Sequence, residues 1–266
     1  MKTVLSLFFT FFFIQTSLAQ LVNIEKERKE KKQGLQGAIA FSLSFKKNTS
    51  SIFIANNNTN IQYTKNKHTL LFLNDYSIIN VKIDKNNTDL ENNNFQHLRY
   101  NYSLLDSNKI TFELFGQRQQ NKIKFLNLRL LAGTGFRFKI IDKDYLSFYI
   151  ATLAMYEKEE LSDSLKSLTS TIKGDFYSSI SVTITDNLSF KNVVYYQPAL
   201  VNLNNYQDFE FIKDYRLFIE SSLKFKIYKN IFYELQFHMS YDSKPPIELI
   251  NTPLFYDFTN QLTFKF

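Results

Sequence analysis

The sequence predicts an all-β fold, a twelve-stranded antiparallel transmembrane β-barrel that follows a cleaved signal peptide. Apolar and polar residues alternate along many short segments, which is the period of a strand with one apolar and one polar face. No stretch beyond the N-terminal signal reaches the roughly 20 consecutive apolar residues that a membrane-spanning helix needs. The connections between segments are short at one end and mostly long at the other, as in bacterial barrels.

The first residues have the features of an export signal. Lys2 supplies a short positive region, residues 4–14 form an apolar run, and Ser17-Leu18-Ala19 is a small-x-small cleavage site before Gln20. We expect cleavage after Ala19, which divides the chain into a signal peptide (1–19), a charged periplasmic arm (20–33) and one barrel domain (34–266). No cysteine flanks the cut, so we expect no lipoprotein anchor.

Composition narrows the chemistry of the mature chain. It has no cysteine and three histidines, so we expect no disulfide, no metal site and no cofactor. Part of the formal charge of +7 comes from residues 25–32, where both signs are interleaved as in a solvated arm. We expect no nucleic-acid partner, because an exported protein has no access to one.

The alternation predicts twelve strands in order. Most segments show it cleanly, and in residues 97–104 Leu98, Tyr100 and Tyr102 oppose His97, Arg99 and Asn101. Two segments between residues 50 and 94 alternate less cleanly, so their boundaries are not defined by pattern. The predicted strands are 35–45, 51–63, 68–83, 97–104, 110–117, 126–138, 146–156, 172–184, 188–196, 209–225, 233–242 and 254–266.

The last segment carries apolar residues on one parity and Asp257, Thr259, Gln261, Thr263 and Lys265 on the other. It resembles the closing strand of bacterial outer-membrane barrels, whose final residues are recognised by the barrel-insertion machinery. The resemblance implies outer-membrane lipid and that machinery as partners. The implied insertion signal consists of Tyr256, Phe258, Leu262, Phe264 and Phe266.

Connection lengths predict which end of the barrel faces outward. With both termini in the periplasm, the inner turns are short: 64–67, 105–108, 140–144, 185–187 and 228–230. The four longest connections fall on the outer side: 84–94, 158–168, 198–207 and 243–252. This alternation favours a barrel in a bacterial outer membrane over a soluble β-sandwich.

Charged residues predict which face of each strand is inside. Arginine or lysine at the lipid midplane costs about 2–4 kcal/mol, so Arg99, Arg129, Arg137 and Arg216 must point inward. Three cations on the apolar parity, Arg118, Lys124 and Lys213, sit near strand ends, where that cost falls toward zero.

Hairpin geometry predicts a ladder of charges inside the barrel. A turn about Asp106 places Arg99 opposite Glu113, and a turn about Asn121 places Glu113 opposite Arg129. A turn about Lys229 gives three more pairs: Glu220 with His238, Lys224 with Glu234, and Arg216 with Asp242. The ladder either fixes strand register and fills the interior, or forms a selectivity ring or binding wall.

Several motifs together resemble the domain of unknown function 481 family, also called salt-induced outer-membrane proteins. They are FQHLRYNY at 95–102, RLLAGTGFR at 129–137, YYQP at 195–198, DYRL at 214–217 with ESSL at 220–223, and YDSKPP at 241–246. The resemblance covers most of the mature chain. It implies a bacterial outer-membrane barrel of unassigned activity, and it transfers no functional residues.

Three functions remain open on the sequence alone. The first is a narrow or plugged barrel with a structural role, or one that acts through its outer loops on another envelope component. The second is a channel for small solutes. The third is a lipid or peptide hydrolase, suggested by His238 and Ser240 on one face of a strand; we expect no enzyme and no catalytic residues.

Overall fold

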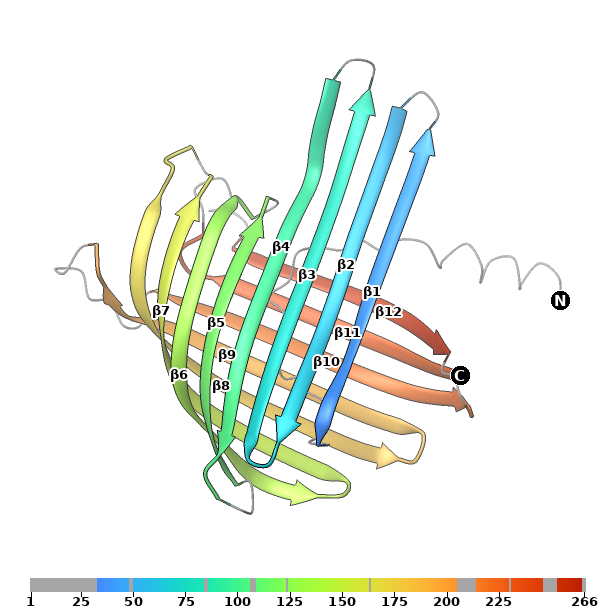
Figure 1. Cartoon of the computed structure of the whole chain (residues 1–266), viewed down its shortest axis with the longest axis vertical. Coiled ribbons are helices and arrows are strands. Elements are labelled where there is room, and N and C mark those ends of the chain that lie inside the picture. Colours follow the sequence, from blue (N-terminus) through green and yellow to red (C-terminus); the bar gives the residue numbers. More distant parts are fainter. Residues whose placement is uncertain are drawn as a thin grey trace.

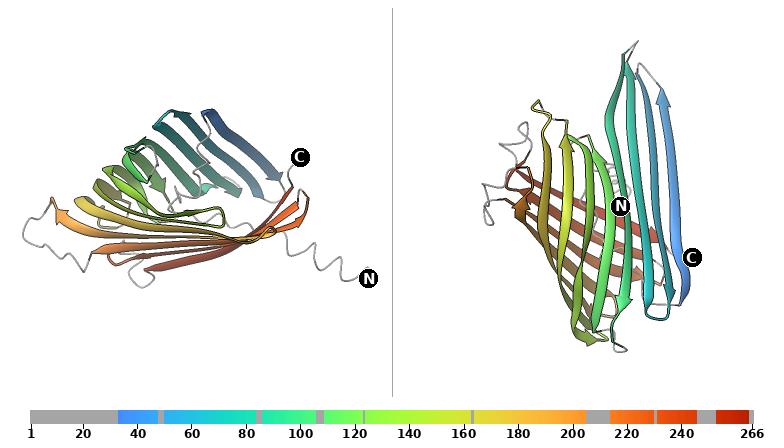
Figure 2. Two further views of the ribbon diagram at one scale, coloured as in Figure 1. Left: turned by 90° about the horizontal axis from the view of Figure 1, so that it is seen from below. Right: turned by 60° about the vertical axis from the view of Figure 1, so that its left-hand side comes forward.

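A computed structural model describes residues 33–47, 50–83, 86–105, 109–122, 124–162, 164–204, 214–229, 231–245 and 253–264. The chain forms one curved antiparallel sheet that wraps round an interior (Figures 1 and 2). Among the described residues, no helix is long and apolar enough to cross a membrane. The predicted signal peptide, the predicted arm up to residue 32, and Lys213, Lys265 and Phe266 lie outside the described residues.

The prediction of twelve antiparallel strands is confirmed, and sequential strands are neighbours throughout the sheet. In the part of the chain that the structure describes, the hydrogen-bonded order runs from β1 to β12 with no ladder joining these two edges. The strands are β1 (Gly34–Lys47), β2 (Ser50–Lys65), β3 (His68–Ile83), β4 (Asn86–Ser103), β5 (Ile110–Asn121), β6 (Leu126–Lys143), β7 (Leu146–Leu161), β8 (Leu168–Thr185), β9 (Leu188–Asn202), β10 (Tyr215–Tyr228), β11 (Ile231–Asp242) and β12 (Leu254–Phe264).

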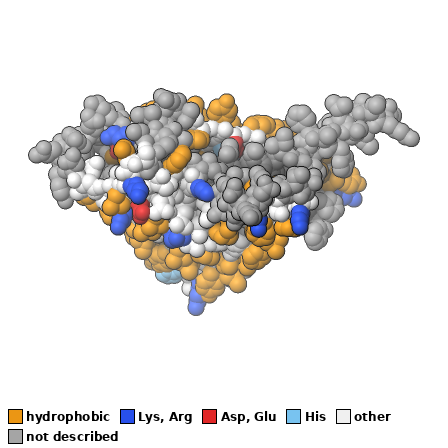
Figure 3. Space-filling model, turned by 90° about the horizontal axis from the view of Figure 1, so that it is seen from above, with side chains coloured by type: hydrophobic (Ala, Val, Ile, Leu, Met, Phe, Trp, Pro, Cys, Tyr) orange, Lys and Arg blue, Asp and Glu red, His pale blue; other side chains and the backbone are white. Residues whose placement is uncertain are grey.

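The two faces of the sheet differ as the alternation predicts. Apolar side chains lie on the outer surface, where Phe41 is 76% and Leu43 77% exposed, and hydrophobic atoms gather over that surface (Figure 3). Along β4 and β5 the opposite parity, including Arg99 and Glu113, is mostly buried on the inside, whereas much of it on β1 stays exposed. The chain therefore turns its apolar rows away from its interior, the reverse of a soluble sandwich.

One end of the sheet carries short turns and the other carries the longer connections. At the short-turn end, β2 passes to β3 through Asn66 and Lys67, and Asn66 takes a positive φ of 55° that suits a tight turn. At the opposite end, called the long-loop end below, the last three connections span residues 162–167, 203–214 and 243–253.

Two predictions about the sheet were wrong. Residues 86–94 belong to β4 and are not an external loop, because β3 and β4 pair as far as Ile83 with Asn86. As a result β1–β4 extend beyond the other strands at the long-loop end (Figure 1). The alternation predicts that Leu126 faces outward with Leu128 and Leu130, but it is 3% exposed, because the register shifts between Leu126 and Leu128.

Candidate functional site: the charged interior

Nearer the short-turn end of the interior, Glu113 on β5 is the centre of a cluster from four strands. Its carboxylate accepts a hydrogen bond of 2.8 Å from Arg99 on β4 and lies 3.3 Å from the Nε of Arg137 on β6. The hydroxyl of Tyr177 on β8 donates to the same carboxylate over 3.3 Å. Glu113 has no exposed surface, so these partners replace water.

His97 on β4 extends this cluster. Its Nε2 accepts a hydrogen bond from the Nε of Arg99 at 3.2 Å, so the ring must carry its proton on Nδ1, which contacts the side-chain oxygen of Gln117 at 3.1 Å. The ring stacks between Phe95 and Phe115. His97 therefore holds the guanidinium of Arg99 in place.

A second cluster lies near the long-loop end. Glu157 on β7 contacts Lys173 of β8 at 2.9 Å and Arg216 of β10 at 2.7 Å. Glu159, also on β7, contacts Arg129 of β6 at 3.1 Å and Arg216 at 2.6 Å. The ion pairs of Arg216 link β7 to β10 through the interior, so they hold non-neighbouring strands together.

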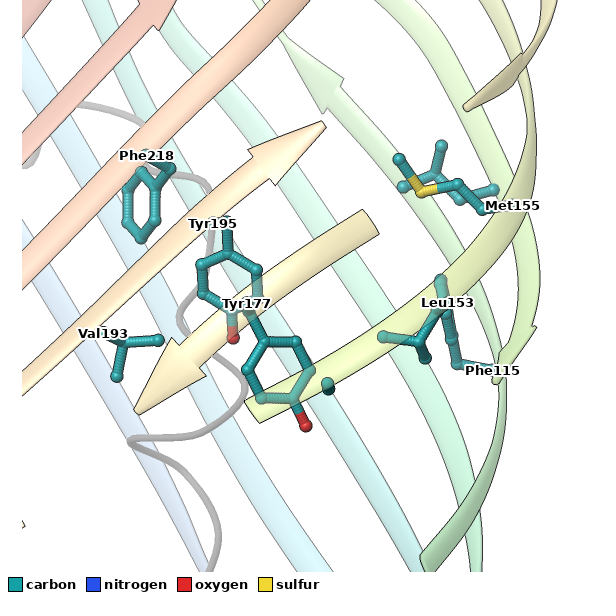
Figure 4. Packing of buried hydrophobic residues seen from close by; sticks show 9 residues of the cluster. Phe115, Leu153, Met155, Tyr177, Val193, Tyr195 and Phe218 are labelled. Atoms are coloured by element: carbon teal, nitrogen blue, oxygen red, sulfur yellow. The ribbon is translucent and has the colours of Figure 1, made fainter. Parts of the chain in front are cut away.

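An apolar layer lies between the two charged clusters, and Asp175 of β8 is buried at its level, opposite Leu153. The layer is formed by inward side chains from β5 to β10, and the labelled members point into the interior (Figure 4). Tyr195 lies between Tyr177 and Phe218, with ring centroids 5.2 and 5.9 Å away. All nine are at most 8% exposed: Phe115, Leu131, Ala151, Leu153, Met155, Tyr177, Val193, Tyr195 and Phe218.

Two glycines of β6 allow this layer to close. A Cβ at Gly133 would lie 2.5 Å from the Phe115 ring and 2.8 Å from the Cβ of Met155. A Cβ at Gly135 would collide with the backbone of Thr152 and Leu153 on β7. The glycines let β6 approach the bulky side chains of β5 and β7.

A small cavity opens beside the second cluster. Its volume is about 50 Å³, and its lining includes Lys124, Arg129, Arg216, Ser240 and Phe255. Lys124 belongs to the connection between β5 and β6, and its side chain reaches β11 and β12. The interior is therefore narrowed at this end by charged side chains from both halves of the sheet.

A family model described as "Protein of unknown function, DUF481" matches residues 39–265. The chain belongs to this family. The resemblance seen in the sequence motifs is thus confirmed, and it covers all twelve strands at least in part. No curated protein matches this DUF481 chain.

Three solved structures are distantly similar to the DUF481 chain. A NanC porin matches at 10% identity, with 87% of this chain, 98% of that chain and a TM-score of 0.46. A bacterial polysaccharide outer membrane secretin matches at 10%, with 87% and 90% covered and a TM-score of 0.40. OmpT of Vibrio cholerae matches at 10%, with 79% and 85% covered and a TM-score of 0.25. Likenesses at this level do not indicate what the DUF481 chain binds.

The pairs predicted about Lys229 are all present in the DUF481 chain. Arg216 donates to Asp242 at 2.8 Å, Lys224 lies 3.5 Å from Glu234, and the His238 ring lies 3.3 Å from Glu220. Each pair is directly opposite across β10 and β11. The tight connection after Tyr228 explains why simple hairpin arithmetic works here.

The other two registers were wrong. Arg99 lies opposite Phe115 and not Glu113, although the long side chain still reaches Glu113 across the diagonal. Glu113 lies opposite Gly135 and not opposite Arg129. Its carboxylate forms ion pairs with Arg99 and Arg137 instead. Arg129 pairs with Glu159 on β7, and Gln119 faces it from β5.

The predicted ladder left out four charged residues that the DUF481 fold brings inside: Glu157, Glu159, Lys173 and Asp175. Their strand parity contained the signal, because Glu157 and Glu159 continue the row of Leu153 and Met155. Lys124 was expected on the lipid-facing parity near a strand end. In the structure it belongs to the connection between β5 and β6, and its side chain points into the interior. The insertion-signal residues Tyr256, Phe258 and Leu262 are exposed on the outer face of β12.

The residues suggested for hydrolysis are engaged with other groups. The imidazole of His238 lies beside Glu220, and the hydroxyl of Ser240 accepts from the Nζ of Lys124 at 3.5 Å. A nucleophilic serine needs its proton acceptor within hydrogen-bond reach. Both side chains face inward in this DUF481 chain, away from the outer surface of the sheet.

Proposed function

We propose that this protein is an integral outer-membrane β-barrel whose interior is plugged by its own side chains. It does not conduct solutes, and it acts structurally or through its long-loop end on another envelope component. The observation that carries the proposal is the apolar layer between two charged clusters. A water-filled pore at this level would have to pass Tyr177, Tyr195 and Phe218, in which the Tyr195 ring contacts the other two across β8, β9 and β10.

The outer face supports a lipid environment. Tyrosines follow one another across β9, β10 and β11 at the long-loop end, with ring centroids of Tyr196 and Tyr215 at 5.7 Å, and of Tyr215 and Tyr241 at 5.6 Å. At the short-turn end, Tyr100 and Tyr102 flank His68. Aromatic residues at both rims of an apolar band are typical of membrane barrels, because their rings suit the lipid headgroup region.

The two ends of the sheet support the proposed orientation. β1 begins and β12 ends at the short-turn end, since the number of antiparallel strands is even. Short turns face the periplasm in bacterial barrels. With the export signal in residues 1–19, this arrangement favours periplasmic termini and an outward-facing long-loop end.

Conductance measurements test the proposal. Purified protein, refolded and inserted into a planar lipid bilayer, should give no stepwise current. Replacing two interior rings together, Tyr177→Ala and Phe218→Ala, should produce steps because the apolar layer is opened. The matched control is Phe176→Ala, which removes a neighbouring ring from the outer face and should leave the bilayer silent. Stepwise current from the unaltered protein would contradict the plugged form.

A small-solute channel is the second candidate, and one observation favours it. The inner parity of β1 carries small residues, and Ala38, Ala40 and Ser42 are exposed there. A passage along β1 would be lined by these residues and by Asn56, which donates to Ser42 at 3.1 Å. If the unaltered protein conducts, Ala40→Phe should reduce the current through such a passage.

The proposal assigns no catalysis to the protein. His238 and Ser240 contact Glu220 and Lys124 inside the sheet, which suits a structural role. The refolded protein should not hydrolyse phospholipid or peptide substrates above the background of a detergent blank. Hydrolysis that disappears in both His238→Ala and Ser240→Ala would overturn this part of the proposal.

A further inference from the structure

Lys124 crosses the long-loop end from one half of the sheet to the other. Its backbone N–H donates to the side chain of Asn121 at 2.9 Å, which fixes the connection after β5. Its Nζ lies 3.5 Å from the hydroxyl of Ser240 on β11 and 5.2 Å from the ring centre of Phe255 on β12. Within the described residues, no carboxylate lies within salt-bridge distance of this ammonium group.

The other cations lining the cavity have carboxylate partners. The three guanidinium nitrogens of Arg216 contact Glu157, Glu159 and Asp242 at 2.7, 2.6 and 2.8 Å. Arg129 contacts Glu159 at 3.1 Å, and its Nη1 donates to the side chain of Gln119 at 3.4 Å. Both arginines therefore have direct ion-pair partners, whereas Lys124 has none within the described residues.

The lining residues themselves include one more cation than carboxylates, and Asp257 of β12 acts on Lys124 from outside the lining. Three cations, Lys124, Arg129 and Arg216, stand against two carboxylates, Glu159 and Asp242. Lys173 and Glu157, just beneath, pair at 2.9 Å and cancel each other. A charge without a direct ion-pair partner in a half-buried site is unfavourable, and an ammonium has three donors, of which the described contacts use one.

We propose that this cavity binds a small oxyanion, a carboxylate or phosphate group, held by the Nζ of Lys124 and the hydroxyl of Ser240. The volume of about 50 Å³ accommodates a group of a few non-hydrogen atoms and not a whole sugar or nucleotide. Arg129 and Arg216 add positive potential without giving up their partners. Oxyanion binding at this cavity does not depend on whether the rest of the interior is closed to ions.

The electrostatics of Lys124 agree with such a ligand. Burial and the nearby charges of Arg129 and Arg216 lower the pKa of Lys124 to about 8, against the weaker opposing effects of Asp242 and Asp257. These groups, with Glu159, are the charged residues that face Lys124 from β6, β7, β10, β11 and β12. A bound oxyanion supplies the direct contact with a negative group that Asp242 and Asp257 do not make, and it favours the ammonium form.

Thermal unfolding of the refolded full chain tests the site. The protein is melted in a phosphate-free, uncharged detergent at pH 7, with sodium chloride replaced stepwise by sodium phosphate or sodium acetate at constant ionic strength. We expect the melting temperature to rise by about 2–4 °C at saturating oxyanion. The rise should fade as the pH is raised above 8.

Two variants locate the effect. Lys124→Met should abolish the oxyanion-dependent rise, and Ser240→Ala should reduce it. Lys158→Met is the control, because Lys158 is an exposed lysine of β7 near the same end of the sheet, and it should keep the full response. An unaltered protein that melts at the same temperature in all three salts would overturn the proposal, as would a full response in Lys124→Met. A response to phosphate but not acetate narrows the ligand to phosphate groups.

Discussion

Arg216 on β10 forms an ion pair of 2.7 Å with Glu157 on β7, across the interior of the curled sheet. These residues are 59 positions apart in sequence, and two strands lie between their own strands. Backbone pairing connects each strand only to its neighbours. This ion pair therefore adds a link that the sheet itself does not provide.

Removing Arg216 should destabilise the protein strongly. Arg216→Met leaves Asp242 without its ion-pair partner and leaves Glu157 and Glu159 with fewer cations. Truncating one member of a buried charged pair costs about 3–5 kcal/mol. Urea unfolding in lipid vesicles, followed by tyrosine fluorescence, should show a loss of this size in the free energy of unfolding.

Arg118→Met is the control for that loss. Arg118 sits near the end of β5 on the parity opposite to Glu113, so its replacement should change the free energy of unfolding by no more than about 0.5 kcal/mol. Equal losses in the Arg216 and Arg118 variants would mean that charge number, and not the interior ion pairs, governs stability.

The glycines of β6 should tolerate substitution unequally. At Gly135, an added Cβ meets the backbone of Thr152 and Leu153, which cannot move without disturbing β7. Gly135→Ala should therefore lower the free energy of unfolding by about 1–3 kcal/mol, the usual cost of overpacking. Gly116→Ala is the matched control, because its Cβ would meet only the Leu131 carbonyl oxygen at 3.9 Å. The same urea titration measures both, and a tolerated Gly135→Ala would contradict the close approach of β6 and β7.

The lowered pKa of Lys124 predicts a pH dependence of stability. Desolvation by burial, with Arg129 and Arg216, lowers this pKa from 10.5 to about 8 in the folded protein. Between pH 8 and pH 10.5, Lys124 binds its proton more strongly in the unfolded chain than in the folded protein. The free-energy cost of burying Lys124 therefore becomes smaller as the pH rises through this range. In oxyanion-free buffer, Lys124→Met should be more stable relative to the unaltered protein at pH 7 than at pH 10. A difference that does not change with pH would contradict the shift.

Strand pattern was sufficient to predict most of the sheet. On β10, Arg216, Glu220 and Lys224 alternate with apolar residues, and the fold places these three where the alternation put them. The pattern failed at residues 86–94, where a run rich in asparagine resembles a loop. There β4 is held by its pairing with β3, which single-sequence alternation does not reveal.

The partners of the interior charges were harder to predict. Register depends on the number of residues in each turn and on irregularities such as the one between Gln119 and Asn121, which displaces the pairing of β5 with β6. Glu157 and Arg216 come together because the sheet curls, which is a long-range effect. The apolar interior layer had a local signal: Leu130 and Leu131, on opposite parities of β6, indicate a strand with apolar residues on both faces.

The orientation of the strands in lipid is the central claim, and accessibility labelling tests it most directly. The chain has no cysteine, so single cysteines placed at Leu217, Phe218, Ile219, Glu220 and Ser221 can carry a fluorescent label in refolded, vesicle-inserted protein. Lipid-attached quenchers should reduce fluorescence at Leu217, Ile219 and Ser221, and should leave Phe218 and Glu220 little changed. Equal quenching along β10, or stronger quenching at the even positions, would contradict an outer face in lipid and a closed interior.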